Sequence, residues 1–527
     1  MKLNYNLGIL LIITFFSNNI TNAQAPVIEW QKSLGGTGID NASSIIKTTD
    51  GGYVIAGNSQ SNNGDVTGNH GSDDFWIVKL NSTGTIQWQK SLGGTNIEYA
   101  NSIIQTIDGG FIVAGSSQSN NGDVSGNHGS GDIWIVKLNS DAGVIEWQKS
   151  LGGSSFDWAT SIKQTSDGGY IIAGNSQSNN GDVTGNHGFI DYWIVKISSI
   201  GTIQWQKTLG GTGDDRATSI IQTIDGGYVV AGYCETNNGD VTGNQGIKDY
   251  WIIKLSSAGV IQWKRCLGGT HVDLAHSIKQ TSDGGFIVAG HAFSSDGDVI
   301  GNDGGTDFWI VKLNSDASVI EWQKSLGGTE TDLAYSINQT TDGGYIITGA
   351  SNSNDGDVTG HHGIQMPKAT FFDYWVVKLN STGTIQWQKS LGGITDDYAA
   401  SIIQTTDGGY IVAGSSNSTD GDVTGNHGSY DYWIVKLSPE NLSTSLFNQN
   451  KIFSLFPNPA KENLTLKIEF FTPSQEITIT DIQGKKIHSQ KVEGLSTTIN
   501  TSNFEKGIYF LNLIDGTQKT TQKFIIE

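Results

Sequence analysis

The stretch Ser102-Ile-Ile-Gln-Thr-Ile-Asp-Gly-Gly-Phe-Ile-Val-Ala-Gly115 decides the fold, because close variants of it occur seven times in the chain. Each copy belongs to a longer repeat, and one recurring tryptophan marks the repeats at Trp30, Trp88, Trp147, Trp205, Trp263, Trp322 and Trp387. These tryptophans are 58 or 59 residues apart, except in the sixth repeat, where a spacing of 65 indicates an insertion at Ile364 to Phe372. Seven such repeats predict an all-β fold, a seven-bladed β-propeller.

Every repeat contains four strand-like runs, which in the second copy are Ser102 to Thr106, Gly110 to Gly115, Ile133 to Leu138 and Val144 to Ser150. All four are rich in β-branched or aromatic residues, and no helical periodicity appears in any copy. The first two runs are joined by an Asp-Gly-Gly sequence, in which glycine supplies the positive φ angle of a tight hairpin turn. We therefore expect four-stranded blades with a repeat of about 58 residues.

The third run of each repeat is apolar on both faces of a strand, so its sheet needs a neighbour on each side. Radial stacking of blades provides this, whereas the alternative, a linear solenoid, would need polar terminal repeats that the sequence lacks. The array begins with a fourth-type strand at Ile28 to Lys32 and ends with a third-type strand at Tyr432 to Leu437. We expect the N-terminal strand to complete the seventh blade and close the ring.

The N-terminus reads as a secretory signal peptide at residues 1–23, with Lys2, an apolar stretch from Leu7 to Phe16 and small residues before Gln24. No later apolar run is long enough for a transmembrane helix, and no cysteine near Gln24 is placed to carry a lipid. The formal net charge of −20 argues against nucleic acid or anionic lipid as a partner. The propeller is expected at residues 24–438 and a polar linker at 439–450.

Residues 451–527 differ in composition from the repeats, since lysine becomes frequent and tryptophan is absent. Short alternating strands in this segment predict a small Ig-like β-sandwich. Pro457-Asn458-Pro459 precedes its first long strand, Gly507-Ile508-Tyr509 lies in a late strand, and the chain ends after Lys523. A carbohydrate-binding or stalk module is the alternative for such a terminal β domain.

These motifs resemble the type A C-terminal sorting domain of the type IX (Por) secretion system. The resemblance implies that Pro457, Asn458, Pro459, Gly507, Tyr509 and Lys523 belong to a sorting signal. It also implies that the secretion machinery is a partner of residues 451–527. The route would run through the periplasm and outer membrane of a member of the Bacteroidota, to the cell surface or the medium. The repeats resemble those of surface proteins from the same bacteria, through phrases such as Gly64-Asp-Val-Thr-Gly-Asn-His-Gly71, and that resemblance implies no activity.

Tryptophan is abundant, but fourteen of the fifteen occupy two fixed repeat positions, which favours packing between blades over stacking on sugars. Trp158 alone falls outside the pattern, and we expect it in the loop after Leu151 as a contact for a ligand. Met366 and Phe371 in the insertion are two further candidates for ligand binding.

Two rows of aspartates recur in the long loop of each repeat. Asp65, Asn69 and Asp74 offer hard oxygen ligands for Ca²⁺, although their spacing matches no EF-hand, and hydrogen bonds that order the loop are the simpler interpretation. The same holds for their repeat equivalents, which begin with Asp123 and Asp132. Histidines such as His70 recur beside them, but Gln245 and Asp303 replace them in two copies. Apart from calcium, no cofactor is expected.

A single active site on a seven-fold scaffold must consist of residues that break the repeat. Besides Trp158 and the insertion, these exceptions are Arg216, Arg265, His271, His276 and His291. No catalytic set can be assembled from them. The sequence therefore favours a binding or adhesion module for an extracellular glycan or protein, with a mainly structural surface protein as the alternative and a propeller-based hydrolase as the remaining option.

The only two cysteines, Cys234 and Cys266, replace serines within a single repeat. Paired replacement in an exported chain favours a disulfide. However, the two residues fall on second and fourth strands, which are not neighbours in a blade. The sequence leaves both a disulfide and two separate thiols open.

Overall fold

The computed structural model describes residues 24–302, 304–363, 371–440, 453–468, 471–515 and 518–527. The chain divides into two compact units, Met1–Asn441 and Leu442–Glu527. The segments predicted as a signal peptide and, from residue 441, as a linker lie outside the described residues. In the part of the chain described, no helix is long and apolar enough to cross a membrane.

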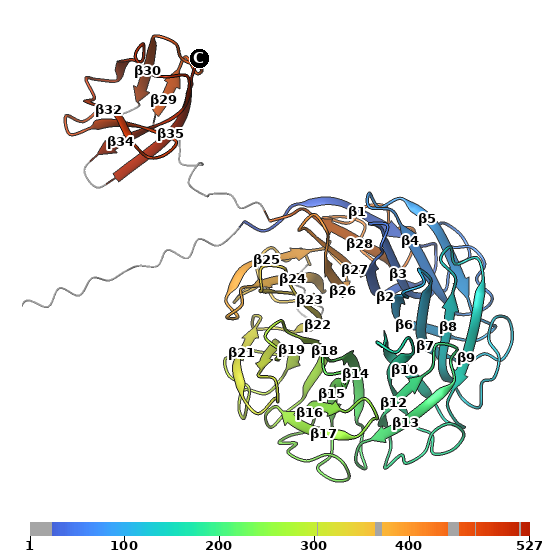
Figure 1. Ribbon diagram of the computed structural model, residues 1–527. Helices are drawn as coiled ribbons and strands as arrows, with labels where there is room; N and C mark the ends of the chain where they lie inside the picture. The colour runs from blue at the N-terminus through green and yellow to red at the C-terminus, as the bar shows by residue number, and fades with distance from the viewer. Residues whose placement is uncertain (1–23, 303, 364–370, 441–452, 469–470, 516–517) are drawn as a thin grey trace, which may run out of the picture. The chain divides into compact units, whose positions relative to one another are not determined.

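The first unit is a seven-bladed β-propeller, and Figure 1 shows its blades arranged around a central axis. Within every blade the strands run antiparallel from the axis outward. The innermost strands are β2 (Asp40–Lys47), β6 (Glu98–Gln105), β10 (Asp157–Gln164), β14 (Arg216–Gln222), β18 (Asp273–Gln280), β22 (Asp332–Gln339) and β26 (Asp397–Gln404). The second strands are β3 (Tyr53–Ser59), β7 (Phe111–Ser117), β11 (Tyr170–Ser176), β15 (Tyr228–Cys234), β19 (Phe286–Ala292), β23 (Tyr345–Ser351) and β27 (Tyr410–Ser416).

The outer half of each blade is equally regular. The third strands are β4 (Asp74–Leu80), β8 (Asp132–Leu138), β12 (Asp191–Ile197), β16 (Asp249–Leu255), β20 (Asp307–Leu313), β24 (Asp373–Leu379) and β28 (Asp431–Leu437). The outermost strands are β5 (Ile86–Leu92), β9 (Ile145–Leu151), β13 (Ile203–Leu209), β17 (Ile261–Leu267), β21 (Ile320–Leu326), β25 (Ile385–Leu391) and, for the last blade, β1 (Ile28–Leu34). We number the blades 1 to 7 in the order of their innermost strands.

The ring closes as the sequence predicts. β1 pairs antiparallel with β28, from Ile28 opposite Leu437 to Leu34 opposite Tyr432, so the first strand of the chain completes blade 7. Each innermost strand contacts the innermost strands of both neighbouring blades, including β2 with β26. This closure removes the exposed sheet edges that a linear solenoid would keep.

The innermost strands begin earlier than the sequence predicts. In the second repeat β6 starts at Glu98, not at Ser102, because a bulge between Ala100 and Ser102 interrupts the alternation of side chains. The same bulge recurs in the other innermost strands, for example between Ala159 and Ser161 of β10. Residues that the sequence assigns to the preceding loop therefore lie on strands beside the axis.

Tryptophan packing between blades explains the fixed tryptophan positions. Trp76 on β4 is fully buried, and its ring lies 4.5 Å from that of Tyr432 in the preceding blade. Trp30 on β1 packs against Tyr53 of blade 1, with ring centroids 6.3 Å apart. Fourteen tryptophans are thus needed for the seven interfaces, which leaves Trp158 with a different role.

The second unit is a two-layer β-sandwich. One sheet has the order β29 (Phe453–Phe456), β30 (Asn463–Ile468), β33 (Ser496–Asn500), and the other has the order β32 (Lys486–Lys491), β31 (Glu476–Asp481), β34 (Gly507–Asp515), β35 (Gln518–Ile526). Their inner faces share one core that includes Leu464, Ile479 and Leu511.

Candidate functional site

Three of the residues that break the repeat, Trp158, Arg216 and His276, lie on the innermost strands around the axis of the propeller. The residue that precedes a buried alanine of the innermost strand, such as Ala42, varies among the blades and is of five different types. At this position the seven blades carry Asn41, Tyr99, Trp158, Arg216, Leu274, Leu333 and Tyr398. The packing residues are thus nearly the same in every blade, whereas the residues beside the axis vary. The surface around the axis is therefore irregular although the scaffold is regular.

A pocket of about 350 Å³ opens at this end of the axis, between blades 6, 7 and 1. We call it the axial pocket, and its lining consists of Asn41, Ala42, Ser43, Tyr335, Tyr398, Ala399, Ala400 and Ser415. Two tyrosine rings, one amide and two hydroxyl groups thus surround a space with small alanine side chains at its base. Such a mixture of aromatic surface and a few polar groups is typical of small-molecule sites.

Tyr398 is held by the groups behind it. Its ring lies 5.2 Å from that of Phe372, and its hydroxyl lies 3.4 Å from the carboxylate of Asp396, which the Tyr430 hydroxyl also approaches. Burial and the Asp396 charge raise the pKa of Tyr430 to about 12 and that of Tyr398 as well, so both phenols stay protonated at neutral pH. Phe372 is the last residue of the insertion, which therefore ends beside the axial pocket.

Tyr335 is backed by two histidines from blade 5. The ring of His276 on β18 lies 5.2 Å from Tyr335 and stacks on His291 of β19 at 5.0 Å. Burial lowers the pKa of His276 to about 4 and that of His291 well below its usual value. Both imidazoles are neutral at pH 7 and serve as a polar support for the pocket wall.

Trp158 lies on strand β10, not in the preceding loop as the sequence predicts, because the strand starts at Asp157. It is half-buried, and the guanidinium of Arg216 stands 5.5 Å from its ring centroid. Asp214 holds Arg216 at 2.6 Å and Lys248 at 2.8 Å. This cluster in blades 3 and 4 does not line the axial pocket.

The other sequence candidates are distributed as follows. Met366 lies outside the described residues, and Phe371 is half-buried but does not line the axial pocket. Arg265 lies on the outermost strand β17 and donates to the Ala317 carbonyl, and the His271 ring packs on Phe293 at 5.4 Å. Tyr335 and Tyr398 could have been found in the sequence by comparing the repeats at the strand positions beside the axis, where residues vary. Counting tryptophans does not identify them.

The predicted calcium ligands make separate hydrogen bonds. Asp65 accepts from Gly35 N, and Asn69 donates to the carbonyls of Ser59 and Ser72. Asp74 accepts from His70 through both the backbone N–H and Nδ1, the latter at 2.7 Å. Among the described residues, no group of three or more histidines, cysteines or acidic residues forms a metal centre.

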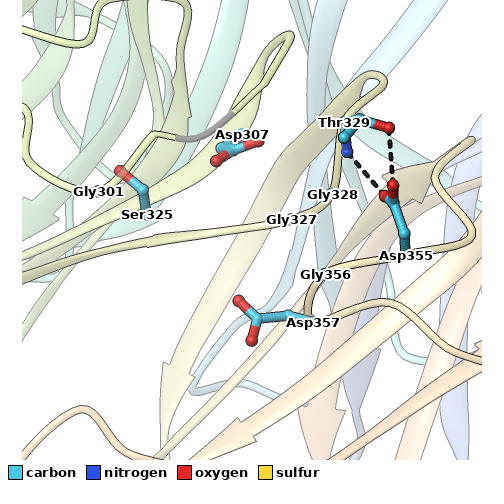
Figure 2. A pocket seen from close by; sticks show the side chains of 9 residues that line it. All are labelled: Gly301, Asp307, Ser325, Gly327, Gly328, Thr329, Asp355, Gly356 and Asp357. Atoms are coloured by element: carbon cyan, nitrogen blue, oxygen red, sulfur yellow. Dashed lines mark hydrogen bonds between the residues drawn. The ribbon is translucent and has the colours of Figure 1, made fainter.

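Aspartates of the two rows instead meet across blade boundaries. His70 bridges them, because its Nδ1 contacts Asp74 and its Nε2 lies 3.9 Å from Asp123 of the next blade. Between blades 5 and 6, where the sequence has Asp303 in place of histidine, Asp307 and Asp357 line a pocket of about 190 Å³ with Thr329 and Asp355. Figure 2 shows its carboxylates and the two hydrogen bonds from Thr329 to Asp355.

The two cysteines lie much closer than their strand order suggests. Cys234 ends β15 and Cys266 lies near the end of β17, so both flank the beginning of β16. Their sulfur atoms are 3.5 Å apart and both side chains are buried. The two thiols are not bonded to each other in this structure, and their mutual contact and burial raise the pKa of Cys234.

In the C-terminal unit, the predicted sorting residues surround the last strand. The Asn458 side chain accepts from Ile525 N at 2.9 Å, and Ala460 N donates to the Ile525 carbonyl at 2.8 Å. The Tyr509 ring stacks on Phe524 at 5.7 Å, and its hydroxyl donates to the Glu505 carbonyl. The Pro457 to Pro459 segment is therefore fixed to strand β35, which also pairs Lys523 with Phe510 and Ile526 with Gly507.

Residues 454–527 match the model of the secretion system C-terminal sorting domain. The second unit is a sorting domain. Its presence indicates export by the type IX secretion system to the cell surface. The sorting domain covers a small part of the chain, so it assigns a route to the propeller but no activity.

Solved structures that are similar to this chain share little sequence with it. Sqt1 from Chaetomium thermophilum is 9% identical with a TM-score of 0.35, over 78% of this chain and 100% of that one. Puromycin hydrolase is 12% identical with a TM-score of 0.38, over 76% of this chain and 53% of that one. PorZ, a surface component of the type-IX secretion system of Porphyromonas gingivalis, is 9% identical with a TM-score of 0.20, over 97% of this chain and 88% of that one. No curated protein matches the chain.

Export through the sorting domain exposes the chain to oxidising conditions, and these conditions favour a disulfide between Cys234 and Cys266. We expect Cys234 and Cys266 to form a disulfide by exchange with an oxidised dithiol donor, which is reduced as the bond forms. Loop entropy then adds on the order of 3 kcal/mol to the free energy of unfolding. Non-reducing peptide mapping of the secreted protein should recover one cross-linked peptide, and two alkylatable thiols would contradict the prediction. The double variant Cys234→Ser, Cys266→Ser is the matched control, because serine stands at both positions in most other blades.

Calcium binding by the two aspartate rows stays an untested prediction, and the pocket in Figure 2, which carboxylates from two blades line, is the place to test it. A ligand that binds only the folded state stabilises it by about 2.7 kcal/mol at a concentration of 100 Kd. Calorimetry in excess Ca²⁺ should therefore show a higher Tm than calorimetry in chelator, and Asp357→Asn should remove the difference. Identical curves for the unaltered protein would exclude structural calcium.

Proposed function

We propose that this chain is a cell-surface binding module, which the sorting domain sends out of the cell and which binds a glycan in the axial pocket. One observation carries the proposal. The blades are nearly identical where they pack, yet they differ around the axis, and this difference creates a pocket with Tyr335 and Tyr398 on its walls. A purely structural propeller has no need for such a departure from its repeat.

The lining of the axial pocket favours a sugar as the ligand. Tyrosine rings offer flat apolar faces on which the C–H face of a pyranose stacks, and their geometry is fixed by Phe372 and His276 behind them. Asn41, Ser43 and Ser415 supply neutral hydrogen-bonding groups for sugar hydroxyls. The volume of about 350 Å³ lies within the usual range of small-molecule sites, about 300 to 1,000 Å³.

We propose no chemical reaction in the axial pocket. The described residues that line the axial pocket include no carboxylate, histidine or lysine, and their titratable groups are the phenols of Tyr335 and Tyr398, whose pKa values burial raises. Asp396 contacts Tyr398 and His276 contacts Tyr335, and neither of them lines the axial pocket. This arrangement supports binding without turnover.

The test is binding of the purified mature protein to glycan arrays and, in parallel, to arrays of extracellular proteins. We expect saturable glycan binding, and loss of about tenfold or more in affinity for Tyr398→Ala and Tyr335→Ala. Tyr99→Ala is the matched control, because Tyr99 occupies the position of Tyr398 in blade 2 but does not line the axial pocket. Binding on the protein array without binding on the glycan array would show that the ligand is a protein. Absence of binding on both arrays would favour a structural role. Turnover of a bound glycan would show that the chain is an enzyme.

A further inference from the structure

Side chains at the ends of the innermost strands join six of the seven blade boundaries. The last residue of β6 is Gln105, and its side-chain carbonyl accepts a hydrogen bond at 2.9 Å from the N–H of Thr49 in the hairpin turn of blade 1. The same bond, 2.9 or 3.0 Å long, recurs at the next five boundaries, where the acceptors are Gln164, Gln222, Gln280, Gln339 and Gln404. Each bond fixes the turn of one blade to the innermost strand of the next.

The boundary between blades 7 and 1 lacks this bond. The last residue of β2 is Lys47, which is exposed and whose ammonium group can only donate. In the part of the chain that the structure describes, the N–H of Thr406 in the turn of blade 7 therefore finds no acceptor on the side chain that blade 1 presents. The third strands of the two blades stay joined, since the Tyr432 hydroxyl donates to the Trp76 carbonyl at 2.9 Å. The missing bond thus concerns the innermost strands.

A second kind of bond is missing at the same boundary. Thr160 on β10 donates at 3.0 Å to the carbonyl of Ala217 in blade 4, and the boundaries on either side have an equivalent bond. Blade 7 carries Ala400 at this position, and alanine has no side-chain donor. Ala400 lines the axial pocket together with Ala42, whose carbonyl corresponds to the acceptor. The axial pocket therefore lies where a side chain that joins other blades is missing.

The path of the chain makes this boundary the place where the ring can open. In every other blade a hairpin turn links the third strand covalently to the outermost strand, which continues into the next blade, as β5 continues into β6. In blade 7 the two strands are β28 and β1, from opposite ends of the propeller sequence, and noncovalent pairing joins them. Separation of blades 7 and 1 therefore breaks no covalent bond.

We propose that the propeller opens transiently at the boundary between blades 7 and 1, and that a glycan in the axial pocket holds this boundary closed. The pocket spans the boundary, because Asn41 and Ser43 of blade 1 line it together with Tyr398 and Ser415 of blade 7. A ligand that contacts both blades takes the place of the missing hydrogen bonds, and it binds the closed ring more tightly than the open one, in which the pocket is divided. The second half of the proposal rests on the proposed glycan binding, and the first half does not.

Hydrogen exchange of the full mature protein, followed by mass spectrometry, tests the first half. The amides of β2 and β26 should exchange faster than those of β10 and β14, which meet at the boundary between blades 3 and 4. Lys47→Gln gives blade 1 the residue of the six other blades and should slow exchange in β2 and β26 about fivefold, the factor expected for one hydrogen bond. Gln222→Lys, the reverse change, should speed exchange in β10 and β14 and leave β2 and β26 unchanged. Equal exchange at the two boundaries, or no effect of Lys47→Gln, would overturn the proposal.

The glycan with the highest affinity on the array is the probe for the second half. It should slow exchange in β2 and β26, leave β10 and β14 unchanged, and have no effect on Tyr398→Ala. Ala400→Thr separates closure from binding, because threonine offers the missing donor to the Ala42 carbonyl but takes up space in the pocket. This variant should exchange slowly without glycan and lose about tenfold in glycan affinity.

The outcomes distinguish this proposal from the proposed function. Glycan binding without a change in the exchange of β2 and β26 would overturn the second half and leave the proposed function intact. If no glycan binds, the proposed function and the second half both fail, and the exchange of the unliganded protein still decides whether the ring opens between blades 7 and 1.

Discussion

Deleting residues 24–34 is expected to lower the free energy of unfolding of the propeller by more than about 5 kcal/mol, because it opens the ring. The deletion removes β1, so β28 becomes an exposed edge. Trp433 loses the hydrogen bond from its Nε1 to Gln31 at 2.8 Å, and Lys436 loses its ion pair with Glu29 at 2.9 Å. The cluster around Leu34, which joins blades 7 and 1, loses an apolar side chain as well.

Urea or thermal unfolding of the mature propeller with and without residues 24–34 measures this effect. Deleting Gln24 alone, which is exposed and precedes the strand, is the control and should have little effect. A synthetic peptide of residues 24–34, added to the shortened protein, should restore much of the lost stability by pairing with β28. Unchanged melting of the shortened protein would mean that ring closure contributes nothing to stability.

The architecture was predictable because a repeat encodes it locally and many times. The Asp-Gly-Gly turn fixes a hairpin within each copy, and the missing strands at the two ends of the array are complementary. What the sequence does not reveal is the bulge in each innermost strand, as at Ala100 and Ser102, because a bulge disrupts the alternation by which strands are recognised. For this reason the sequence places Trp158 in a loop, although it lies on β10.

The axial pocket depends on which positions face the axis, and that follows only from the strand boundaries. Tyr335 and Tyr398 come from adjacent blades and from different positions of their strands, so no spacing in the sequence connects them. The sequence does reveal exceptions to the repeat, and His276, which supports Tyr335, is one of them. Contacts between blades also bring aspartates of different repeats together, since His70 contacts Asp74 and lies 3.9 Å from Asp123 of the next blade.

A further feature of the blade boundaries is a ring of buried carboxylate pairs. At the first boundary, Asp74 of blade 1 and Glu98 of blade 2 each place an oxygen 2.5 Å from the point where a Cβ on Gly93 would stand, so these oxygens lie at most 5.0 Å apart. Glycine is required there because any side chain would collide with both carboxylates. The other boundaries repeat the arrangement with Asp132 and Asp157, Asp191 and Asp215, Asp249 and Asp273, Asp307 and Asp332, Asp373 and Asp397, and Asp431 and Asp40.

The pair between blades 4 and 5 lacks the histidine that donates to the third-strand aspartate in most blades. Gln245 stands in its place, and among the described residues the Asp249 carboxylate accepts a hydrogen bond from the Gln245 N–H at 2.7 Å. Burial, with the charges of Asp273 and Asp298, raises the pKa of Asp249 from 3.8 to about 7. The folded protein therefore holds a proton at Asp249 more tightly than the unfolded chain does.

The raised pKa of Asp249 makes the stability of the folded protein depend on pH. A carboxyl whose pKa is raised on folding destabilises the fold when it is ionised, so stability is lost as the pH rises through about 7 and is regained as the pH falls toward 4. A shift from 3.8 to about 7 corresponds to a difference of up to about 4 kcal/mol between these limits. Other groups titrate in the same range, including His276 with a pKa lowered to about 4, so the Asp249 contribution must be isolated by substitution.

Asp249→Asn is expected to stabilise the protein by about 4 kcal/mol at pH 8 and by about 2 kcal/mol at pH 5, where Asp249 is protonated in the folded protein but still ionised in the unfolded chain. The amide keeps an acceptor for the Gln245 N–H and offers a donor toward Asp273, so it stands in for the protonated acid. Urea unfolding of both proteins at the two pH values gives the double difference, in which the other titrating groups cancel. Asp141→Asn is the control, because turn hydrogen bonds lower the pKa of this exposed carboxylate and keep it ionised at both pH values. An equal effect of Asp249→Asn at pH 5 and pH 8 would show that the carboxylate pair is not a site of proton uptake on folding.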